Sequence, residues 1–204
     1  MRVIAGSLRG RRLGAPRGQG TRPTSDRVRE ALFAMLGDLQ GASVLDLFAG
    51  TGALGIEALS RGAARALFVE RDRDALRALR SNLRALALRA PLANVRGGDA
   101  LAALRDAQNG GETYDLVFVD PPYARAGELQ APLVELLPRV LSENGGRVAV
   151  ESDRRAPLKL PLTALRERRY GDTVIAIYGK MSDEGSGRVP DRGRRSEAGQ
   201  GDQA

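Results

Sequence analysis

The sequence predicts an α/β fold with a doubly wound, mostly parallel sheet and helices on both of its faces. From residue 43 onward, short apolar runs alternate with stretches of helical periodicity, which is the pattern of successive β-α units. Residues 116–119, Leu-Val-Phe-Val, are apolar throughout, and such runs favour strands that a parallel sheet buries on both faces. We expect a small N-terminal β-hairpin and helix to precede this sheet as an appendage.

Each expected element follows from these patterns and from turn or capping residues. Residues 1–13 predict two short strands around a Gly-Ser turn. A helix capped by Thr24 or Ser25 is expected next, with Gly37 as its stop. In the sheet, strands are expected at 43–47, 66–70, 94–96, 115–120 and 147–151, with helices near 53–61, 72–89, 99–107 and 127–141 and a closing hairpin of 165–169 and 173–178.

Charge and composition divide the 204 residues into three expected segments. Residues 1–24 form a basic N-terminal arm, 25–180 the main domain, and 181–204 a tail that we expect to be disordered because it has almost nothing to bury. The first 25 residues contain six arginines and no acidic residue, so most of the formal net charge of +7 lies there. Coding bias explains the preference for arginine over lysine but not this placement, which is typical of a protein that binds a phosphate backbone.

The chain has no histidine and no cysteine. This composition excludes Ser-His-Asp and Cys-His triads, imidazole acids or bases, and zinc sites with the usual ligands. It also excludes disulfides, so a hydrophobic core has to hold the fold together. Any chemistry must therefore use carboxylates, hydroxyls, backbone groups and arginine. No leader and no apolar run of membrane-spanning length is evident, so we expect a cytoplasmic protein.

A glycine-rich turn follows the first expected strand of the sheet and opens a helix. Gly50, Gly52 and Gly55 match the dinucleotide fingerprint, and Glu70 lies twenty residues beyond Gly50, so an NAD-dependent oxidoreductase is one alternative. Asp46 argues against it, because a carboxylate just before the turn would repel a pyrophosphate. A cationic ligand such as S-adenosylmethionine, with its sulfonium and ammonium, would be favoured instead. A turn whose aspartate is simply bonded to backbone amides is the structural alternative.

Two further acidic residues follow the next two expected strands. Glu70 has two carboxylate oxygens that can accept hydrogen bonds from both hydroxyls of a ribose, although it could also pair with Arg71 or Arg73 on the surface. Asp99, before Ala100, is placed to bind an adenine amino group, and it is equally well placed to cap the following helix. The sequence alone leaves both alternatives open at each position.

The sequence Asp120-Pro121-Pro122-Tyr123 follows the apolar run 116–119 and is the sharpest functional signal in the chain. Two prolines at the end of a strand hold the backbone extended, so the Asp120 carboxylate and the Pro121 carbonyl can face one point. An exocyclic amine on a nucleobase is a poor nucleophile because its lone pair is delocalised into the ring. Two acceptors on its N–H groups favour a pyramidal nitrogen, while Tyr123 offers a ring on which an extruded base can stack.

Together these motifs resemble the S-adenosylmethionine-dependent amino-methyltransferases with the Asp-Pro-Pro-Tyr signature. More narrowly, the chain resembles the bacterial 16S ribosomal RNA guanine-N2 methyltransferases, the RsmD-like family, over about residues 1–180. The signature quartet is shared with adenine-N6 enzymes of DNA and RNA, so the N-terminal Arg-Pro-Thr block is what narrows the choice. The matching stretches are residues 4–6, 9–11, 22–30, 45–55, 57–58 and 118–123.

The resemblance implies a Rossmann-like methyltransferase sheet, S-adenosyl-L-methionine as cofactor, and 16S ribosomal RNA or a small-subunit assembly intermediate as partner. We expect a monomer that needs neither a membrane nor a metal. The quartet Asp120 to Tyr123 would be catalytic, and Arg9, Arg11 and Arg12 are candidates for contacts with RNA phosphates. The expected cofactor residues are Asp46, Phe48, Ala49, Gly50, Gly52, Glu70, Asp99, Ala100, Arg22 and Thr24.

Several alternatives stay open from the sequence. Arg22 and Thr24 could bind the carboxylate of the cofactor, or they could belong to a capped helix with an exposed arginine. An adenine-N6 methyltransferase, an oxidoreductase and a non-catalytic ribosome-assembly protein are the competing functions. C5 methylation of pyrimidines is excluded, since it needs a cysteine nucleophile. A second basic row at helical spacing more often marks a solvated face than an RNA contact: Arg73, Arg77, Arg80 and Arg84.

Overall fold

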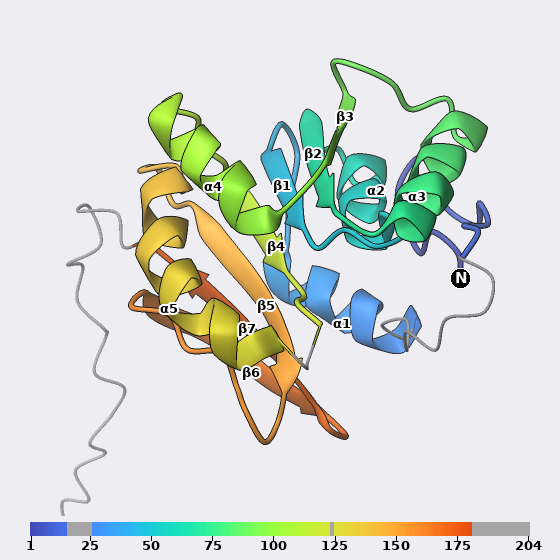
Figure 1. Cartoon of the computed structure of the whole chain (residues 1–204). Helices are drawn as coiled ribbons and strands as arrows, with labels where there is room; N and C mark the ends of the chain where they lie inside the picture. The colour runs from blue at the N-terminus through green and yellow to red at the C-terminus, as the bar shows by residue number, and fades with distance from the viewer. Residues whose placement is uncertain (16–25, 123–124, 181–204) are drawn as a thin grey trace, which may run out of the picture.

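A computed structural model describes residues 1–15, 26–122 and 125–180. Within these ranges the strands form one seven-stranded sheet, with helices packed on both sides (Figure 1). The predictions for Arg22, Thr24, Tyr123 and the tail lie outside the described residues. In chain order the elements are α1 (Asp26–Leu36), β1 (Ser43–Leu47), α2 (Ala53–Ser60), β2 (Arg65–Glu70), α3 (Arg73–Ala85), β3 (Ala93–Gly97), α4 (Ala100–Asn109), β4 (Leu116–Val119), α5 (Ala126–Leu136), the 3₁₀ helix η2 (Leu137–Val140), β5 (Arg147–Asp153), β6 (Thr163–Tyr170) and β7 (Thr173–Gly179).

The strand order, β3-β2-β1-β4-β5-β7-β6, determines where ligands can bind. Strands β1 to β5 pair in parallel, whereas β7 is antiparallel to both β5 and β6. The order reverses between β1 and β4, and open α/β sheets bind ligands outside the carboxyl ends of their strands at such a switch point. The predicted doubly wound sheet is confirmed. Its antiparallel β7, placed between β5 and β6, distinguishes it from the dinucleotide-binding order 3-2-1-4-5-6.

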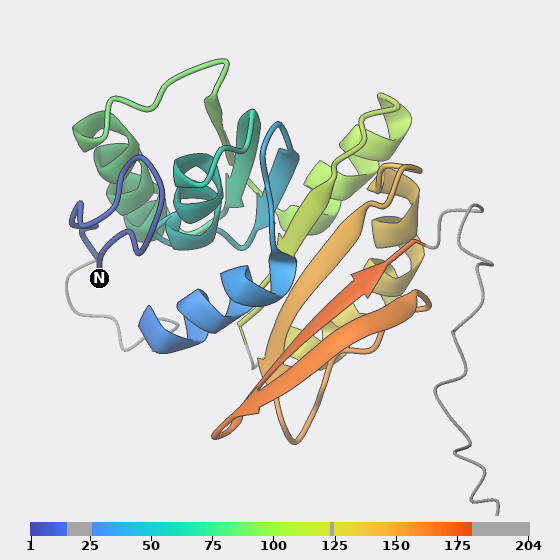
Figure 2. The same ribbon diagram turned by 180° about the vertical axis from the view of Figure 1, so that it is seen from behind.

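Each face of the sheet carries its own apolar core. One core joins α1, α2 and α3 to the sheet and includes Phe33, whose ring centroid lies 5.7 Å from that of Phe118 in β4. The other joins α4, α5 and the segment 154–162 to the opposite face, where the Tyr178 hydroxyl donates to the Leu158 carbonyl at 3.2 Å. Figure 2 shows the α1 side of the molecule. Strand β4 contributes alternate residues to both cores, as its uninterrupted apolar sequence predicts.

The first thirteen residues form a hairpin-shaped loop rather than the two expected strands. In this part of the described chain the only bridge is an isolated one, between Arg2 and Arg12. The amides of Ile4 and Ala5 donate instead to the Glu57 carboxylate in α2, at 2.7 and 3.0 Å. Backbone bonds from the Val3 amide to the Arg11 carbonyl at 2.9 Å and from the Leu13 amide to the Met1 carbonyl at 3.0 Å keep the expected hairpin. Regular strands do not form because the next amides bond to a helix that lies about fifty residues further along the chain.

Two helices are shorter than the sequence predicts. α3 ends at Ala85 rather than near residue 89, and Ala87 has a φ of 56°, a left-handed conformation that an α-helix does not contain. α5 ends at Leu136 and continues as η2, because Pro138 has no amide hydrogen with which to extend the α-helical ladder. The other expected elements from residue 43 onward agree with the structure to within two residues at each end.

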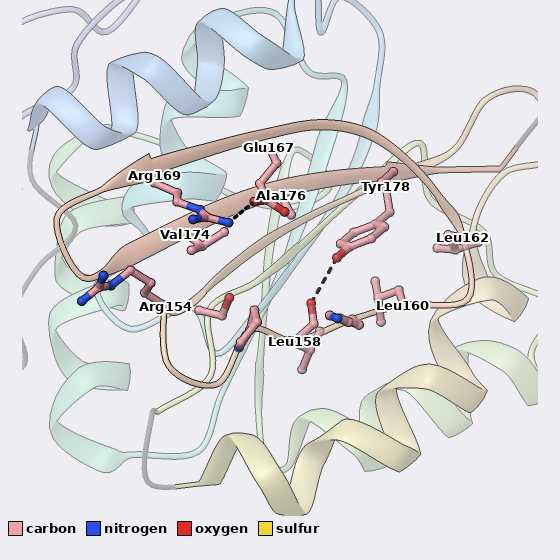
Figure 3. A pocket seen from close by; sticks show the side chains of 13 residues that line it. Arg154, Leu158, Leu160, Leu162, Glu167, Arg169, Val174, Ala176 and Tyr178 are labelled. Carbon is pink, nitrogen blue, oxygen red and sulfur yellow. Dashed lines mark hydrogen bonds and ion pairs between the residues drawn. The ribbon is translucent and has the colours of Figure 1, made fainter.

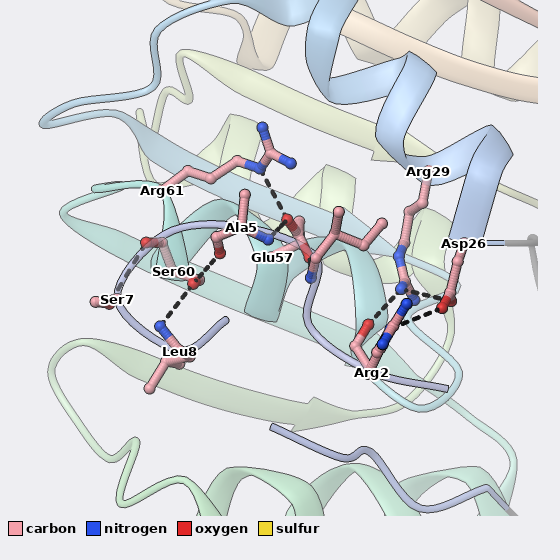
Figure 4. A network of polar contacts seen from close by, with 10 residues as sticks. Arg2, Ala5, Ser7, Leu8, Asp26, Arg29, Glu57, Ser60 and Arg61 are labelled. Atoms are coloured by element: carbon pink, nitrogen blue, oxygen red, sulfur yellow. Dashed lines mark hydrogen bonds and ion pairs between the residues drawn. The ribbon is translucent and has the colours of Figure 1, made fainter. Parts of the chain in front are cut away.

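A buried polar network fastens the N-terminal arm to α1 and α2 (Figure 4). The Glu57 side chain is 1% exposed and accepts hydrogen bonds from two amides of the arm and, at 2.8 Å, from Arg61. Arg29 of α1 is also buried, and it donates to the Arg2 carbonyl and, at 3.0 Å, to Asp26. The arm is therefore held by buried charged groups more than by strand pairing.

Replacing Glu57 by alanine is expected to lower the free energy of unfolding by about 3 kcal/mol, because two amides and a guanidinium lose their acceptor. Glu57→Gln keeps one carbonyl oxygen and is expected to lose less. Urea denaturation followed by circular dichroism measures both variants. If Glu57→Ala were as stable as the wild type, the arm would not depend on this carboxylate.

Candidate active site

Four carboxylates lie in a row across the carboxyl edge of the sheet, one for each of four neighbouring strands. Glu70 ends β2, Asp46 lies in β1, Asp120 follows β4, and Glu151 lies in β5. The residues just before Glu70, Asp120 and Glu151 are paired in register across β1, β4 and β5. Alternation along the strands places all four side chains on the α1–α3 face. We call these four residues the carboxylate row.

The loop between β1 and α2 contains three residues with left-handed backbone conformation. Phe48, Gly50 and Gly52 have φ values of 60°, 55° and 82°. At Gly52 a Cβ atom would lie 2.4 Å from Cδ1 of Leu79, so packing as well as conformation requires glycine. Phe48 lacks glycine's freedom, and strain of this kind is typical of functional sites. The Ala49 amide donates to β2 at 3.0 Å, which fixes the loop beside the carboxylate row.

Asp46 is the most deeply buried member of the row, with 2% of its surface exposed. Its Oδ2 accepts a hydrogen bond from the Gly55 amide at 2.9 Å, which holds the start of α2 against β1. Burial, and to a smaller extent the Glu70 carboxylate, raises the pKa of Asp46 to about 7, although the Gly55 bond opposes this effect. The backbone bond expected as the structural alternative is present. The hydrogen bond from Gly55 does not offset the cost of burying a negative charge on Asp46. A cationic ligand beside Asp46 would reduce this cost.

Glu70 joins the glycine loop to the start of α3 through backbone amides. Its Oε2 accepts from the Gly50 amide at 2.8 Å, and its Oε1 accepts from the amides of Arg71 and Asp72 at 2.7 and 2.8 Å. These bonds fix the orientation of the carboxylate and leave room for a further donor on Oε2. Binding of ribose hydroxyls by Glu70 stays a prediction, and the geometry favours Oε2 as the acceptor.

Asp99 caps α4. Its Oδ1 accepts from the amides of Leu101 and Ala102 at 2.9 and 3.2 Å, so the capping alternative is confirmed. Both bonds use the same oxygen, and a carboxylate can cap a helix with one oxygen while it accepts from an adenine amine with the other. Ala100 is buried at the first helical position, beside this carboxylate. Adenine binding by these two residues stays a prediction.

Asp120 and Pro121 directly follow β4, the middle strand of the sheet. Pro121 is buried, and the carbonyl of the exposed Pro122 accepts from the Arg125 amide at 2.9 Å, which closes the turn. Burial raises the pKa of Asp120 well above its usual value, and the carboxylates of Glu151 and of β1 add to this rise. Once ionised, a carboxylate with a raised pKa is a stronger proton acceptor, and a cationic ligand beside Asp120 would favour this ionised form, which can bind and deprotonate an amine.

The three arginines that are candidates for RNA contacts lie away from the carboxylate row. Arg9, Arg11 and Arg12 are exposed, and Arg11 donates to the Ala85 carbonyl at the end of α3 at 3.0 Å. The turn of the arm bonds to the Ser60 carbonyl at the C-terminal end of α2, whose other end begins beside the row. Any contact between these arginines and RNA is therefore separated from Asp120 by the length of α2.

Two residues of the site region were not singled out from the sequence. Asn82 of α3 accepts from the Gly14 amide at 2.8 Å and donates to the carbonyls of Gly14 and Thr51 at 3.0 Å, so it ties the end of the arm to the glycine loop. Glu151 follows the buried run 148–150 as Asp120 follows β4. Glu151 lacks the two prolines that marked Asp120, so an acidic residue at the end of an apolar strand is the only sequence signal it shares with Asp120.

A separate cavity of about 510 Å³ lies between the segment 154–162 and strands β6 and β7 (Figure 3). Its lining includes Leu158 and Tyr178, with Arg154 and Arg169 at one end. The lining strand residues belong to the α4–α5 face, opposite to the carboxylate row. The cavity is therefore not the place where that row would hold a ligand.

The carboxylate row fits S-adenosyl-L-methionine better than a dinucleotide. The phosphates of NAD would face four carboxylates, two of which already have a raised pKa because of burial and of neighbouring carboxylates in the row. A sulfonium and an ammonium would bring positive charge to the same place. Among the residues that the structure describes, no group of three acidic side chains is arranged to hold a metal ion.

Comparison with known proteins identifies the family. The family described as conserved hypothetical protein 95 matches residues 1–179. Ribosomal RNA small subunit methyltransferase D of Haemophilus influenzae is 36% identical over 186 residues, which cover 87% of this chain and 93% of that protein. The protein of the same name from Escherichia coli K12 is 44% identical over 146 residues, or 71% of this chain and 68% of that protein. The chain belongs to this methyltransferase D family.

Solved structures agree with this assignment. The Escherichia coli protein yhhF has a TM-score of 0.76 at 38% identity, over 89% of this chain and 98% of that chain. A protein from Thermus thermophilus has a TM-score of 0.73 at 33% identity, over 87% of this chain and 98% of that chain. The Rossmann-like methyltransferase fold and the family resemblance predicted from the sequence are thus confirmed. No helix in the described ranges is long and apolar enough to span a membrane.

Proposed function

We propose that this protein transfers a methyl group from S-adenosyl-L-methionine to the exocyclic N2 amine of a guanine in 16S ribosomal RNA. Membership of the methyltransferase D family supports both the reaction and the small-subunit RNA substrate. The main structural support for the proposed active site is the position of Asp120, at the end of the middle strand and within the carboxylate row. We propose further that the enzyme acts as a cytoplasmic monomer without a metal, on RNA or on an assembly intermediate.

Asp120 and Pro121 are proposed to orient the amine. The Asp120 carboxylate and the Pro121 carbonyl accept its two N–H groups, and its lone pair then points at the methyl group. S-adenosyl-L-methionine supplies this methyl on a positively charged sulfur, which keeps the electron pair of the broken C–S bond as the N–C bond forms. The nitrogen then gives a proton to Asp120 or to solvent. Orientation, and acceptors aimed at developing positive charge, would provide most of the rate enhancement. Tyr123 is proposed to stack on the extruded base.

The glycine loop and its neighbours are proposed to hold the cofactor. Asp46 would favour its positive charges, Glu70 would accept from a ribose hydroxyl, and Asp99 with Ala100 would bind the adenine. Arg22 and Thr24 are proposed to bind its carboxylate. Phe48, Ala49, Gly50 and Gly52 would shape the loop against which it lies.

Analysis of modified nucleosides tests this function. Purified 16S ribosomal RNA and small-subunit particles from cells that lack the enzyme are incubated with it and with labelled S-adenosyl-L-methionine. Digestion and mass spectrometry are expected to give N2-methylguanosine in at least one of the two substrates. N6-methyladenosine instead would assign the adenine alternative, and RNA binding with no methyl transfer would assign a non-catalytic role in assembly.

Reversal of three charges in the arm tests the RNA contact. Changing Arg9, Arg11 and Arg12 together to glutamate is expected to weaken RNA binding and to lower the slope of log affinity against log salt by about two to three. Fluorescence anisotropy at several salt concentrations measures this slope. A control variant with two reversed charges on the α4–α5 side, Arg105→Glu and Arg139→Glu, is expected to change the slope less per reversed charge. Equal slopes for the triple variant and the wild type would remove the arm from the RNA interface.

A further inference from the structure

We infer that Glu151 recognises the base that is methylated, by accepting a hydrogen bond from the N1–H of guanine beside the reacting amine. The inference rests on the proposed function and assigns base selection to a carboxylate outside the Asp-Pro-Pro-Tyr quartet. Glu151 is then a specificity-determining residue, whereas Asp120 and Pro121 orient the amine itself.

The strand register places Glu151 beside Asp120. Val150 of β5 pairs with Val119 of β4, so the next residue on each strand, Glu151 and Asp120, lies at the same level of the sheet. Neighbouring strands of a sheet are separated by about 4.8 Å, so the two carboxylates can converge on adjacent donor groups of one base. Of the two carboxylates that raise the pKa of Asp120, Glu151 also has the larger effect.

Both side chains lie on the same face of the sheet. Phe118 and Ala149, two residues before Asp120 and Glu151, belong to the core that packs against α1, α2 and α3. Alternation along a strand gives residues two apart the same direction, so Asp120 and Glu151 share that face. Both are half-buried, which leaves each carboxylate reachable by a ligand at the edge of the sheet.

The edge of guanine matches this pair of carboxylates. Guanine carries N1–H next to its N2 amine, so two neighbouring donors face the protein. When Asp120 and Pro121 accept the two hydrogens of N2, the N1–H is left for Glu151. Adenine and cytosine instead have a ring-nitrogen lone pair next to their exocyclic amines, and a carboxylate repels that lone pair. Positive charge that develops on N2 during methyl transfer makes the neighbouring N1–H more acidic, which would strengthen its hydrogen bond to Glu151.

A base analogue separates this role from a general electrostatic one. RNA with guanine or 2-aminopurine at the target position is assayed with the wild type and with Glu151→Gln. 2-Aminopurine keeps the N2 amine but has a lone pair at N1. In kcat/KM the wild type is expected to prefer guanine by about 100-fold or more, since a polar site rejects an analogue that leaves it unpaired. Glu151→Gln can donate to that lone pair, so the preference is expected to fall at least about tenfold, with a higher absolute rate on 2-aminopurine.

Two further variants make the result specific. Asp153→Asn removes the same charge two residues along β5 and is expected to keep the wild-type preference. Glu151→Asp retracts the carboxylate by one methylene and is expected to lower kcat while it still disfavours 2-aminopurine. Calorimetry with S-adenosyl-L-methionine and thermal unfolding show whether each variant is folded and binds cofactor.

The outcomes distinguish this inference from the proposed function. An unchanged preference for guanine in Glu151→Gln overturns the inference. An equal loss of rate on both RNAs also overturns it, because a residue that acts only through Asp120 or the cofactor would slow both reactions equally. An equal shift in Asp153→Asn also overturns it. A wild-type enzyme that methylates neither these RNAs nor small-subunit particles contradicts the proposed function itself, and if only particles are methylated the two bases are compared in RNA assembled into particles.

Discussion

Asp120→Ala is expected to lower kcat by about 100-fold or more while the dissociation constant of S-adenosyl-L-methionine changes by less than about threefold. The carboxylate lies at the end of β4, on the substrate side of the row, so its removal takes an acceptor from the amine and leaves the glycine loop intact. Single-turnover transfer of a labelled methyl group to RNA and calorimetry with the cofactor measure the two quantities separately.

Asp120→Asn is the matched control for this prediction. It keeps a carbonyl oxygen that can accept one N–H group, but it removes the charge and the ability to take a proton. A rate between those of the wild type and Asp120→Ala is therefore expected. If Asp120→Ala turned over at the wild-type rate, the catalytic assignment would be wrong. If the two variants were equally slow, the negative charge rather than the acceptor would carry the effect.

Binding of S-adenosyl-L-methionine is expected to tighten as pH rises through about 7 and to release a proton. Burial raises the pKa of Asp46 from 3.8 to about 7, so much of this carboxyl is protonated in the ligand-free protein at neutral pH. A cationic ligand prefers the ionised form, which becomes fully available only above this pKa. Calorimetry between pH 6 and 8, in buffers with different ionisation enthalpies, measures the affinity and the proton release. A flat profile would place the cofactor's charge elsewhere.

The same shift predicts how stability depends on pH. Between pH 3.8 and 7 the folded protein holds a proton on Asp46 that the unfolded chain has released, so stability falls as pH rises and levels off above about pH 7. The pKa shift of Asp46 corresponds to a loss of roughly 4 kcal/mol at most in the free energy of unfolding. Asp46→Asn is expected to remove this part of the slope, to stabilise the ligand-free protein at pH 8 and to weaken cofactor binding. The raised pKa of Asp120 acts in the same direction and keeps part of the slope.

The parallel sheet could be predicted because its strands depend on local sequence. β1 has the expected bounds, and β4 differs by one residue at each end, since runs buried on both faces leave little choice of conformation. The N-terminal arm was predicted less well. Its amides bond to Glu57 and to Ser60, more than fifty positions away, and no local pattern in residues 1–13 indicates that partner.

In the candidate site, too, local sequence motifs predicted some residues, whereas others depend on contacts between distant parts of the chain. Asp46 and Asp120 were found because each accompanies a motif with restricted backbone, a glycine turn or a pair of prolines. Glu151 has no such motif, and only the register with β4 brings it beside Asp120. At Asp99 the sequence could not separate capping from ligand binding, because the same acceptor chemistry serves both and one oxygen is enough for the cap.

The position of β4 between two groups of strands has a consequence for how this family can change. Cofactor contacts are proposed on β1, β2 and the start of α4, whereas Glu151 and the hairpin of β6 and β7 belong to the last third of the chain. Substitutions in that last third, or its exchange between relatives, can then alter which nucleotide is accepted. The strands proposed to bind the methyl donor, β1 and β2, would not be disturbed. New substrates would evolve by changing one side of the sheet while the middle strand keeps the chemistry.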